Sequence, residues 1–176
     1  AQLGSQAIAS SLKAGAIGLA IVMVFMIVMY AVPGIAASLA LAIYTTLVIA
    51  TLYLFDITLT LPGIAGIILG IGMAVDANVI VFARIREEIA TGKSVQTSMK
   101  IGFQKAMSAI LDGNITTLIA SVVLMALGSG TVKGFAYTLM IGIILSLFTA
   151  MVVTRYILYS LYALGLKSEK LYGRAK

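Results

Sequence analysis

Residues 61–83 read LPGIAGIILGIGMAVDANVIVFA, a run of mostly apolar residues interrupted by one acid and one amide. A helix needs about 20 apolar residues to cross a bilayer, and this run has that length. Thr60 precedes it as an expected N-cap, and Pro62 falls in the first turn, where the missing N–H of proline is tolerated. The run therefore predicts a transmembrane helix.

Four more apolar blocks flank this helix, and a turn at Pro33 and Gly34 is expected between the first two. The block 115–127 is too short to span alone, so its helix must begin near residue 109. The sequence thus predicts a single all-α integral membrane domain over residues 1–176, a bundle of five transmembrane helices. The expected spans are 14–32, 35–55, 61–83, 109–128 and 134–154.

The composition agrees with a membrane protein, because 61% of the residues are hydrophobic and only 10% are charged. Soluble domains carry about 25% charged residues. Histidine and cysteine are both absent, which excludes imidazole and thiolate metal sites, serine–histidine triads and disulfides. We expect no enzyme, no metal and no bound cofactor.

The basic residues predict the orientation. Ten of the twelve lie in the 84–108 segment or in the tail after the last span, and only Lys13 and Lys133 lie on the other side. This places the C-terminus in the cytoplasm and Ala1 outside. Because the charges flank apolar blocks, they indicate membrane orientation and not nucleic-acid binding. An outside start also predicts a further span before Ala1.

The segment between the third and fourth spans has apolar residues at helical spacing, namely Val95, Met99, Phe103, Met107 and Ile110. With Ser94 as N-cap, it predicts a basic amphipathic helix at about 94–108, lying at the cytoplasmic membrane surface. Its role is either packing and orientation or gating and partner docking.

Asp76 is the main candidate for function, because a carboxylate inside a span is costly and faces a bundle interior or a water path. It either handles protons or forms a structural hydrogen bond to a neighbouring helix. The spans have no Lys or Arg in their middle, and Arg84 is about 12 Å farther along the helix. Asp76 is therefore either protonated at rest or paired with a basic group from outside this chain.

Polar residues could form a hydrated route to Asp76, with Asn78, Asn114 and Thr117 lining it. Small residues recur three or four apart on the third and fifth spans, a pattern typical of closely packed membrane helices. Helix packing alone remains the alternative for both sets. The packing glycines are Gly66, Gly70, Gly134 and Gly142.

Two enzymatic motifs fail. The run Gly92-Lys93-Ser94 resembles the end of a phosphate-binding loop, but Glu87 stands where the first glycine is needed. An intramembrane aspartyl protease needs two facing carboxylates, and Asp76 is the one acid in the middle of a span. Neither ATP hydrolysis nor proteolysis is supported.

Several motifs in order resemble the SecD family of protein-export membrane proteins. They are LPGIAGI at 61–67, AVDANV at 74–79, RIREEI at 84–89, DGNITTL at 112–118, KGFA at 133–136 and FTA at 148–150. The resemblance implies a relation to the resistance–nodulation–division transporters, and six spans with a large extracytoplasmic domain after the first. This chain would supply spans two to six.

The resemblance also implies a function and partners. Such proteins act with SecF beside the SecYEG channel, in the membrane lipid of a bacterial or archaeal cytoplasmic membrane, and use the proton-motive force to draw a translocating polypeptide outward. Protons would be the coupling ion. Asp76 would be the proton-relay residue, with SecF supplying its basic counter-charge. Its implied polar neighbours are Asn78, Asn114, Thr116 and Thr117.

Two rival functions remain. One is a proton-coupled small-molecule exporter of the same superfamily, which needs a substrate pocket. The other is a passive structural scaffold of the translocon, for which Asp76→Asn leaves activity intact.

Overall fold

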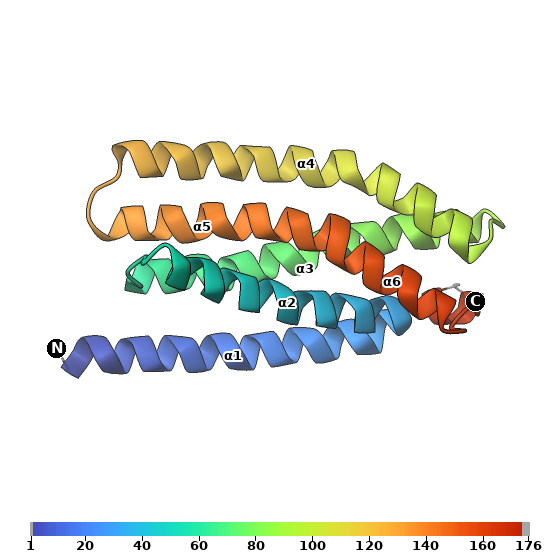
Figure 1. Ribbon diagram of the computed structural model, residues 1–176, viewed down its shortest axis with the longest axis horizontal. Coiled ribbons are helices and arrows are strands. Elements are labelled where there is room, and N and C mark those ends of the chain that lie inside the picture. Colours follow the sequence, from blue (N-terminus) through green and yellow to red (C-terminus); the bar gives the residue numbers. More distant parts are fainter. Residues whose placement is uncertain (1, 174–176) are drawn as a thin grey trace.

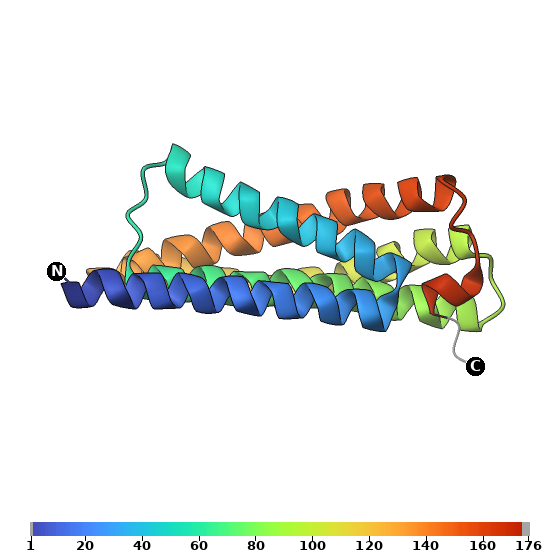
Figure 2. The ribbon, with the colours of Figure 1, turned by 90° about the horizontal axis from the view of Figure 1, so that it is seen from below.

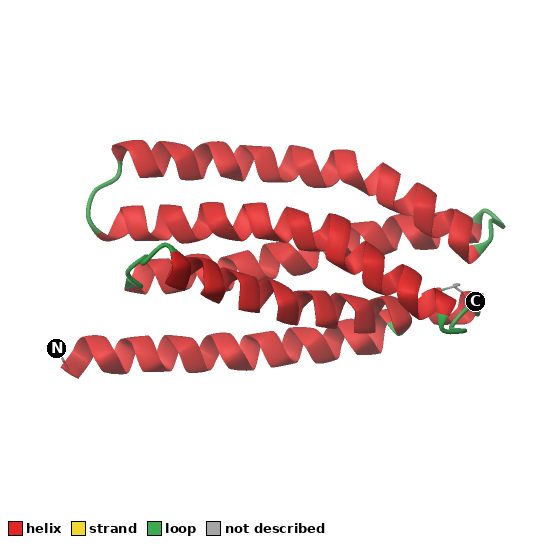
Figure 3. Ribbon diagram, in the orientation of Figure 1, coloured by secondary structure: helices red, strands yellow, loops and turns green. Residues whose placement is uncertain are grey.

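The computed structural model describes residues 2–173, with side chains from residue 4 onward. Within these residues all regular elements are helices (Figure 3). A five-residue π-helix joins α5 and α6 into one continuous rod. The elements are α1 (Gln2–Tyr30), α2 (Val32–Leu54), α3 (Leu61–Ala90), α4 (Val95–Leu127), α5 (Thr131–Phe148), η1 (Thr149–Val153), α6 (Thr154–Ala163) and the 3-10 helix η2 (Glu169–Tyr172).

Five helices in the described residues are long and apolar enough to cross a membrane, which confirms the predicted fold class. The α5–η1–α6 rod, Thr131–Ala163, counts as one of them. Figure 1 shows α1 beginning at one end of the bundle and η2 lying at the other. An odd number of spans requires this separation.

The centre of the bundle is α3, which packs most extensively on α5 and α4, while α1 lies against α2 and α3. Figure 2 shows α2 and α6 on one side of the bundle and α1 on the other. The buried side chains of α2 and α3, such as Tyr44 and Phe82, fill the space between these layers. At the start of α3, the Thr60 hydroxyl accepts a hydrogen bond from the Gly63 amide at 3.1 Å, which confirms the predicted cap.

The turn between the first two spans differs from the expectation. The break falls at Ala31, whose φ is 50°, and Pro33 and Gly34 already belong to the first turn of α2. Proline is tolerated there. Gly34 is needed because a Cβ on it would lie 2.0 Å from the carbonyl oxygen of Met26.

The separate amphipathic helix predicted at 94–108 is instead the first half of α4, which runs unbroken to Leu127. Ser94 caps it as predicted, accepting from the Thr97 amide at 3.3 Å. The predicted apolar stripe is buried against the bundle at Met99 and Phe103, although Met107 is 41% exposed. This half of the helix packs on α3, and Gly102 permits close approach to Ile85. An isolated glycine does not end a helix.

Candidate functional site

Asp76 is an exposed side chain of α3 that borders a small cavity between α3 and α4. The cavity has a volume of about 200 Å³. Its walls are Met73, Asp76, Ala77 and Ile80 from α3 with Ala109, Ile110, Gly113, Asn114 and Thr117 from α4. The carboxylate therefore faces an open space shared by two helices instead of a neighbouring side chain.

Two of the predicted polar neighbours meet Asp76 at this cavity. Asn114 uses its amide N–H to donate to the carbonyl of Ile110 at 2.7 Å, which leaves its side-chain oxygen available at the wall. The Thr117 hydroxyl donates to the Gly113 carbonyl at 3.5 Å. The site thus combines a carboxylate with an amide and a hydroxyl, groups that can order water or a protonated partner.

Two other predicted neighbours lie elsewhere. Thr116 is exposed on α4, donates to the carbonyl of Asp112 at 3.3 Å, and is not part of the cavity wall. Asn78 is 2% exposed, is not part of the cavity wall and points into the bundle towards α6. Residues two apart on a helix do not share a face, so Asn78 and Asp76 diverge.

Asn78 forms an interhelical hydrogen bond that the sequence did not reveal. Its side-chain oxygen accepts from the hydroxyl of Thr154 at 2.7 Å, and its N–H donates to the Ala74 carbonyl at 3.1 Å. Thr154 begins α6 directly after the π-helix η1. A π-bulge shifts the register of the following turn, and such a shift is not visible in a hydrophobic pattern.

The four predicted packing glycines gather where α3 crosses α5. A Cβ on Gly66 would lie 2.2 Å from the Thr138 hydroxyl, and the backbones of Gly70 and Gly142 are nearly in contact. Gly134 lies against Thr60 in the same way. Because a side chain on Gly66 would collide with α5, this crossing is tightly closed.

Tyr44 of α2 lies beside that crossing and was not singled out from the sequence. It is fully buried, and its hydroxyl has no hydrogen-bond partner among the described residues. A Cβ on Gly70 would come within 2.4 Å of that oxygen. The hydroxyl therefore fills the space that the glycines leave.

Asp76 has no basic partner within the described residues. The ion pairs there join Arg84 to Glu87, and Lys93 and Lys105 to Glu88. The cavity wall holds neither lysine nor arginine. Within residues 2–173, no lysine or arginine forms an ion pair with Asp76.

The end of the bundle with the α3–α4 turn is held by ion pairs and by a partly buried hydrogen bond. Glu88 is nearly buried and accepts from Lys93 and, at 2.5 Å, from Lys105, which joins α3 to α4. At η2, the Tyr172 hydroxyl donates to the Leu166 carbonyl at 2.8 Å. Burial, with a smaller contribution from Tyr162, raises the pKa of Tyr172 to about 12, which favours the protonated hydroxyl that this bond requires.

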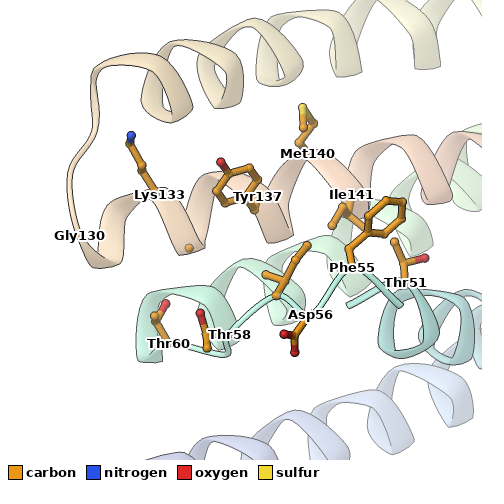
Figure 4. Close-up of a pocket in the computed structure, with 12 residues that line it drawn as sticks. Thr51, Phe55, Asp56, Thr58, Thr60, Gly130, Lys133, Tyr137, Met140 and Ile141 are labelled. Carbon is orange, nitrogen blue, oxygen red and sulfur yellow. The ribbon is translucent and has the colours of Figure 1, made fainter. Parts of the chain in front are cut away.

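A larger cavity, about 630 Å³, lies at the opposite end of the bundle between the α2–α3 turn and α5 (Figure 4). In Figure 4, Asp56 and Lys133 point in different directions, and no ion pair joins them. The polar residues of this cavity are Asp56, Lys133, Tyr137 and three threonines, and the rest of its lining is apolar or glycine. Size alone does not mark a site of chemistry, and the small α3–α4 cavity remains the better candidate.

Comparison with known proteins agrees with the resemblance seen in the sequence. The family described as "Protein export membrane protein SecD/SecF, C-terminal" matches residues 1–163. The chain belongs to the SecD/SecF family. The predicted family is therefore confirmed, and the five spans are those of a SecD/SecF transmembrane region.

Curated SecD/SecF relatives are similar over nearly the whole chain. The SecD subunit of the protein translocase from Synechocystis is 54% identical over 90% of this chain, and that from Acidaminococcus fermentans is 52% identical over 90%. The chain spans 34% and 38% of the length of those two proteins.

A solved structure shares the fold. The crystal structure of SecDF from Thermus thermophilus, described as a translocon-associated membrane protein, matches with a TM-score of 0.87 and 35% identity. The match covers 95% of this chain and 22% of that one.

Proposed function

We propose that this chain is the membrane part of an accessory subunit of the Sec machinery, and that Asp76 couples the proton-motive force to polypeptide export. Its SecD relatives are named protein translocase subunits, and the similar SecDF is described as translocon-associated. A proton crossing 100 mV releases about 2.3 kcal/mol, enough to bias an equilibrium between two arrangements of a helix bundle.

The observation that carries the proposal is the open face at Asp76. A lipid-embedded carboxylate without a partner is unfavourable, so this face must be completed by water, a proton or a basic group. Asn114 and Thr117 lie on the same cavity wall and can hold water beside the carboxylate. The arrangement suits a group that alternates between a protonated and an ion-paired state.

The basic group would come from outside this chain, and SecF is the proposed source. A positive side chain that enters the α3–α4 cavity would reach Asp76 through this cavity. Proton uptake by Asp76 would break that pair, and the two partners would move relative to each other. The SecYEG channel and the moving polypeptide would respond to this movement.

The proposed location is the cytoplasmic membrane, with the α3–α4 turn and η2 facing the cytoplasm. The described basic residues support this orientation because most of them lie on the parts of α3, α4, α6 and the tail at one end of the bundle (Figure 1). Arg174 and Lys176 also belong to the predicted cytoplasmic set but lie outside the described residues.

The test replaces Asp76 with asparagine in the gene that encodes this chain in its host. Polypeptide translocation into inverted membrane vesicles is measured with and without a proton gradient. We expect D76N to remove the gradient-dependent part of translocation while leaving the amount of membrane-inserted protein unchanged. D56N is the matched control, because Asp56 is an exposed acid at a turn and asparagine tolerates its φ of 50°.

Normal gradient dependence in D76N, with the complex intact, would contradict proton coupling at Asp76 and favour the scaffold function. Co-purification with SecF is measured in the same samples. Loss of SecF binding in D76N but not in D56N would support the proposed pair between Asp76 and SecF, but the loss of translocation would then follow from the lost complex and would not show proton coupling.

A further inference from the structure

A second polar cavity, unrelated to Asp76, lies between α4 and the start of α6. Its volume is about 180 Å³, several times the volume of a water molecule in the liquid. The residues that line it are Lys100, Phe103, Gln104, Met107, Met151 and Arg155. It therefore combines two cations and an amide with an aromatic ring and two thioethers, and none of its lining residues is acidic.

The two cations of this cavity are not neutralised by ion pairs between described residues. Those ion pairs use Glu87 and Glu88 and involve neither Lys100 nor Arg155. The Arg155 guanidinium lies 5.9 Å from the ring centre of Phe103 and 5.9 Å from that of Tyr159. Both rings lie within cation–π range of the guanidinium, and no described carboxylate forms an ion pair with it.

The cavity also has the surroundings of a site at the membrane surface. Tyr156, the neighbour of Arg155, is 76% exposed, as expected of an aromatic residue at the headgroup level. Met107 is 41% exposed beside the cavity, although it belongs to an otherwise buried stripe. Met107 and Met151 thus give the cavity an apolar wall beside its cationic groups, and Met107 is the exposed part of that wall.

We infer that this cavity binds the phosphate of an anionic phospholipid, with its acyl chains against the exposed apolar wall. Arg155 offers a planar fork of N–H donors that matches two phosphate oxygens, and Lys100 adds a point charge. Gln104 can donate to a further headgroup oxygen. Basic pockets between transmembrane helices on the cytoplasmic side suit such headgroups. A free phosphate shares this chemistry, but the apolar wall favours the lipid.

Native mass spectrometry of the purified chain in dodecyl maltoside measures how tightly one lipid molecule binds. The probes are dioleoylphosphatidylglycerol, dioleoylphosphatidylcholine and inorganic phosphate. We expect the variant K100Q/R155Q to bind phosphatidylglycerol about thirtyfold more weakly than the wild type. The control K167Q/K170Q removes the same charge from the tail, outside the cavity, and we expect less than about threefold weakening.

A thermal melt without lipid reports whether each variant folds. If the double variant does not fold, the variant R155K is measured instead, because lysine keeps the positive charge but lacks the planar pair of N–H donors. Weaker phosphatidylglycerol binding by R155K supports the site, and unchanged binding overturns it. Equal weakening in the tail control, or equally tight phosphatidylcholine, also overturns it. Competition by inorganic phosphate at the lipid's own concentration would assign the cavity to the free anion and overturn the lipid.

Discussion

The two long faces of α3 differ in how completely they are closed. The face toward α5 is packed around Gly66 and Gly70 and continues to Asn78, which is hydrogen-bonded to Thr154. The face toward α4 is interrupted by a cavity that exposes Asp76. One face therefore contributes to stability, and the other leaves a carboxylate open to a proton or a partner. Two polar residues only two positions apart thus have different expected roles.

The largest expected effect comes from overfilling the closed face. Replacing Gly66 with leucine places a side chain into Thr138 and the Phe135 carbonyl, where a Cβ alone would lie 2.2 and 3.2 Å away. We expect the free energy of unfolding in detergent to fall by about 3 kcal/mol. The control is Gly72→Leu on the same helix, since a Cβ there has no neighbour within 4 Å. Leucine favours a helix more than glycine does, so propensity cannot explain a loss at either position. A Gly72 variant as unstable as the Gly66 variant would show that the loss does not come from packing against α5.

A smaller effect is expected from the polar end of the closed face. Asn78→Ala removes a buried hydrogen bond and leaves the Thr154 hydroxyl without its partner, so unfolding should become easier by about 2 kcal/mol. A double-mutant cycle with Thr154→Val isolates the bond itself. Hydrogen bonds between membrane helices average about 0.6 kcal/mol in such cycles. Additive losses would mean that the bond contributes nothing and that the cavity left by Asn78 explains the change.

A substitution of Tyr44 tests whether water is present at the crossing of α3 and α5. Its hydroxyl is buried without a partner, so Tyr44→Phe removes an unsatisfied polar group while keeping the ring. We expect the free energy of unfolding to rise by about 1 kcal/mol, measured in the same detergent assay. A loss of stability would instead show that the hydroxyl is satisfied, for example by water at the crossing of α3 and α5.

The smallest change in stability is expected at the open face. Asp76→Asn replaces an exposed group that makes no ion pair with described residues, so unfolding should change by less than about 0.5 kcal/mol. Together with the loss of gradient-dependent export proposed above, this would separate function from stability on one helix. A loss as large as that of Asn78→Ala would make Asp76 a structural residue.

Local signals were enough for much of this fold. Apolar runs of bilayer length predicted four of the spans, and the fourth span was found by extending a short apolar block towards its N-terminus. Thr60 and Ser94 were recognised as caps from residue type and position. The errors arose where packing overrides local preference. Proline at position 33 suggested a turn, but the break occurred at Ala31, and the amphipathic half of α4 joined the span after it.

The candidate site was predictable only in part. Asp76, Asn114 and Thr117 were named from the sequence and share one cavity, whereas Asn78 and Thr116 lie apart from it. Residue type indicates which groups are costly in a membrane, but the direction in which each one faces depends on the rotation of its helix. The partner of Asn78 depends further on the π-helix, which changes that rotation for α6 alone.

The sequence by itself determined the membrane class, the number of spans and the family, and it singled out one intramembrane carboxylate as a candidate, because hydrophobicity and residue chemistry are properties of the chain. Only the tertiary structure decided that Asp76 borders a cavity, that Asn78 is hydrogen-bonded to Thr154, and that Lys100 and Arg155 line one cavity together. These relations join residues far apart in the chain. They follow from how the five helices rotate about their axes and cross, and the small-residue pattern indicates only which faces pack closely.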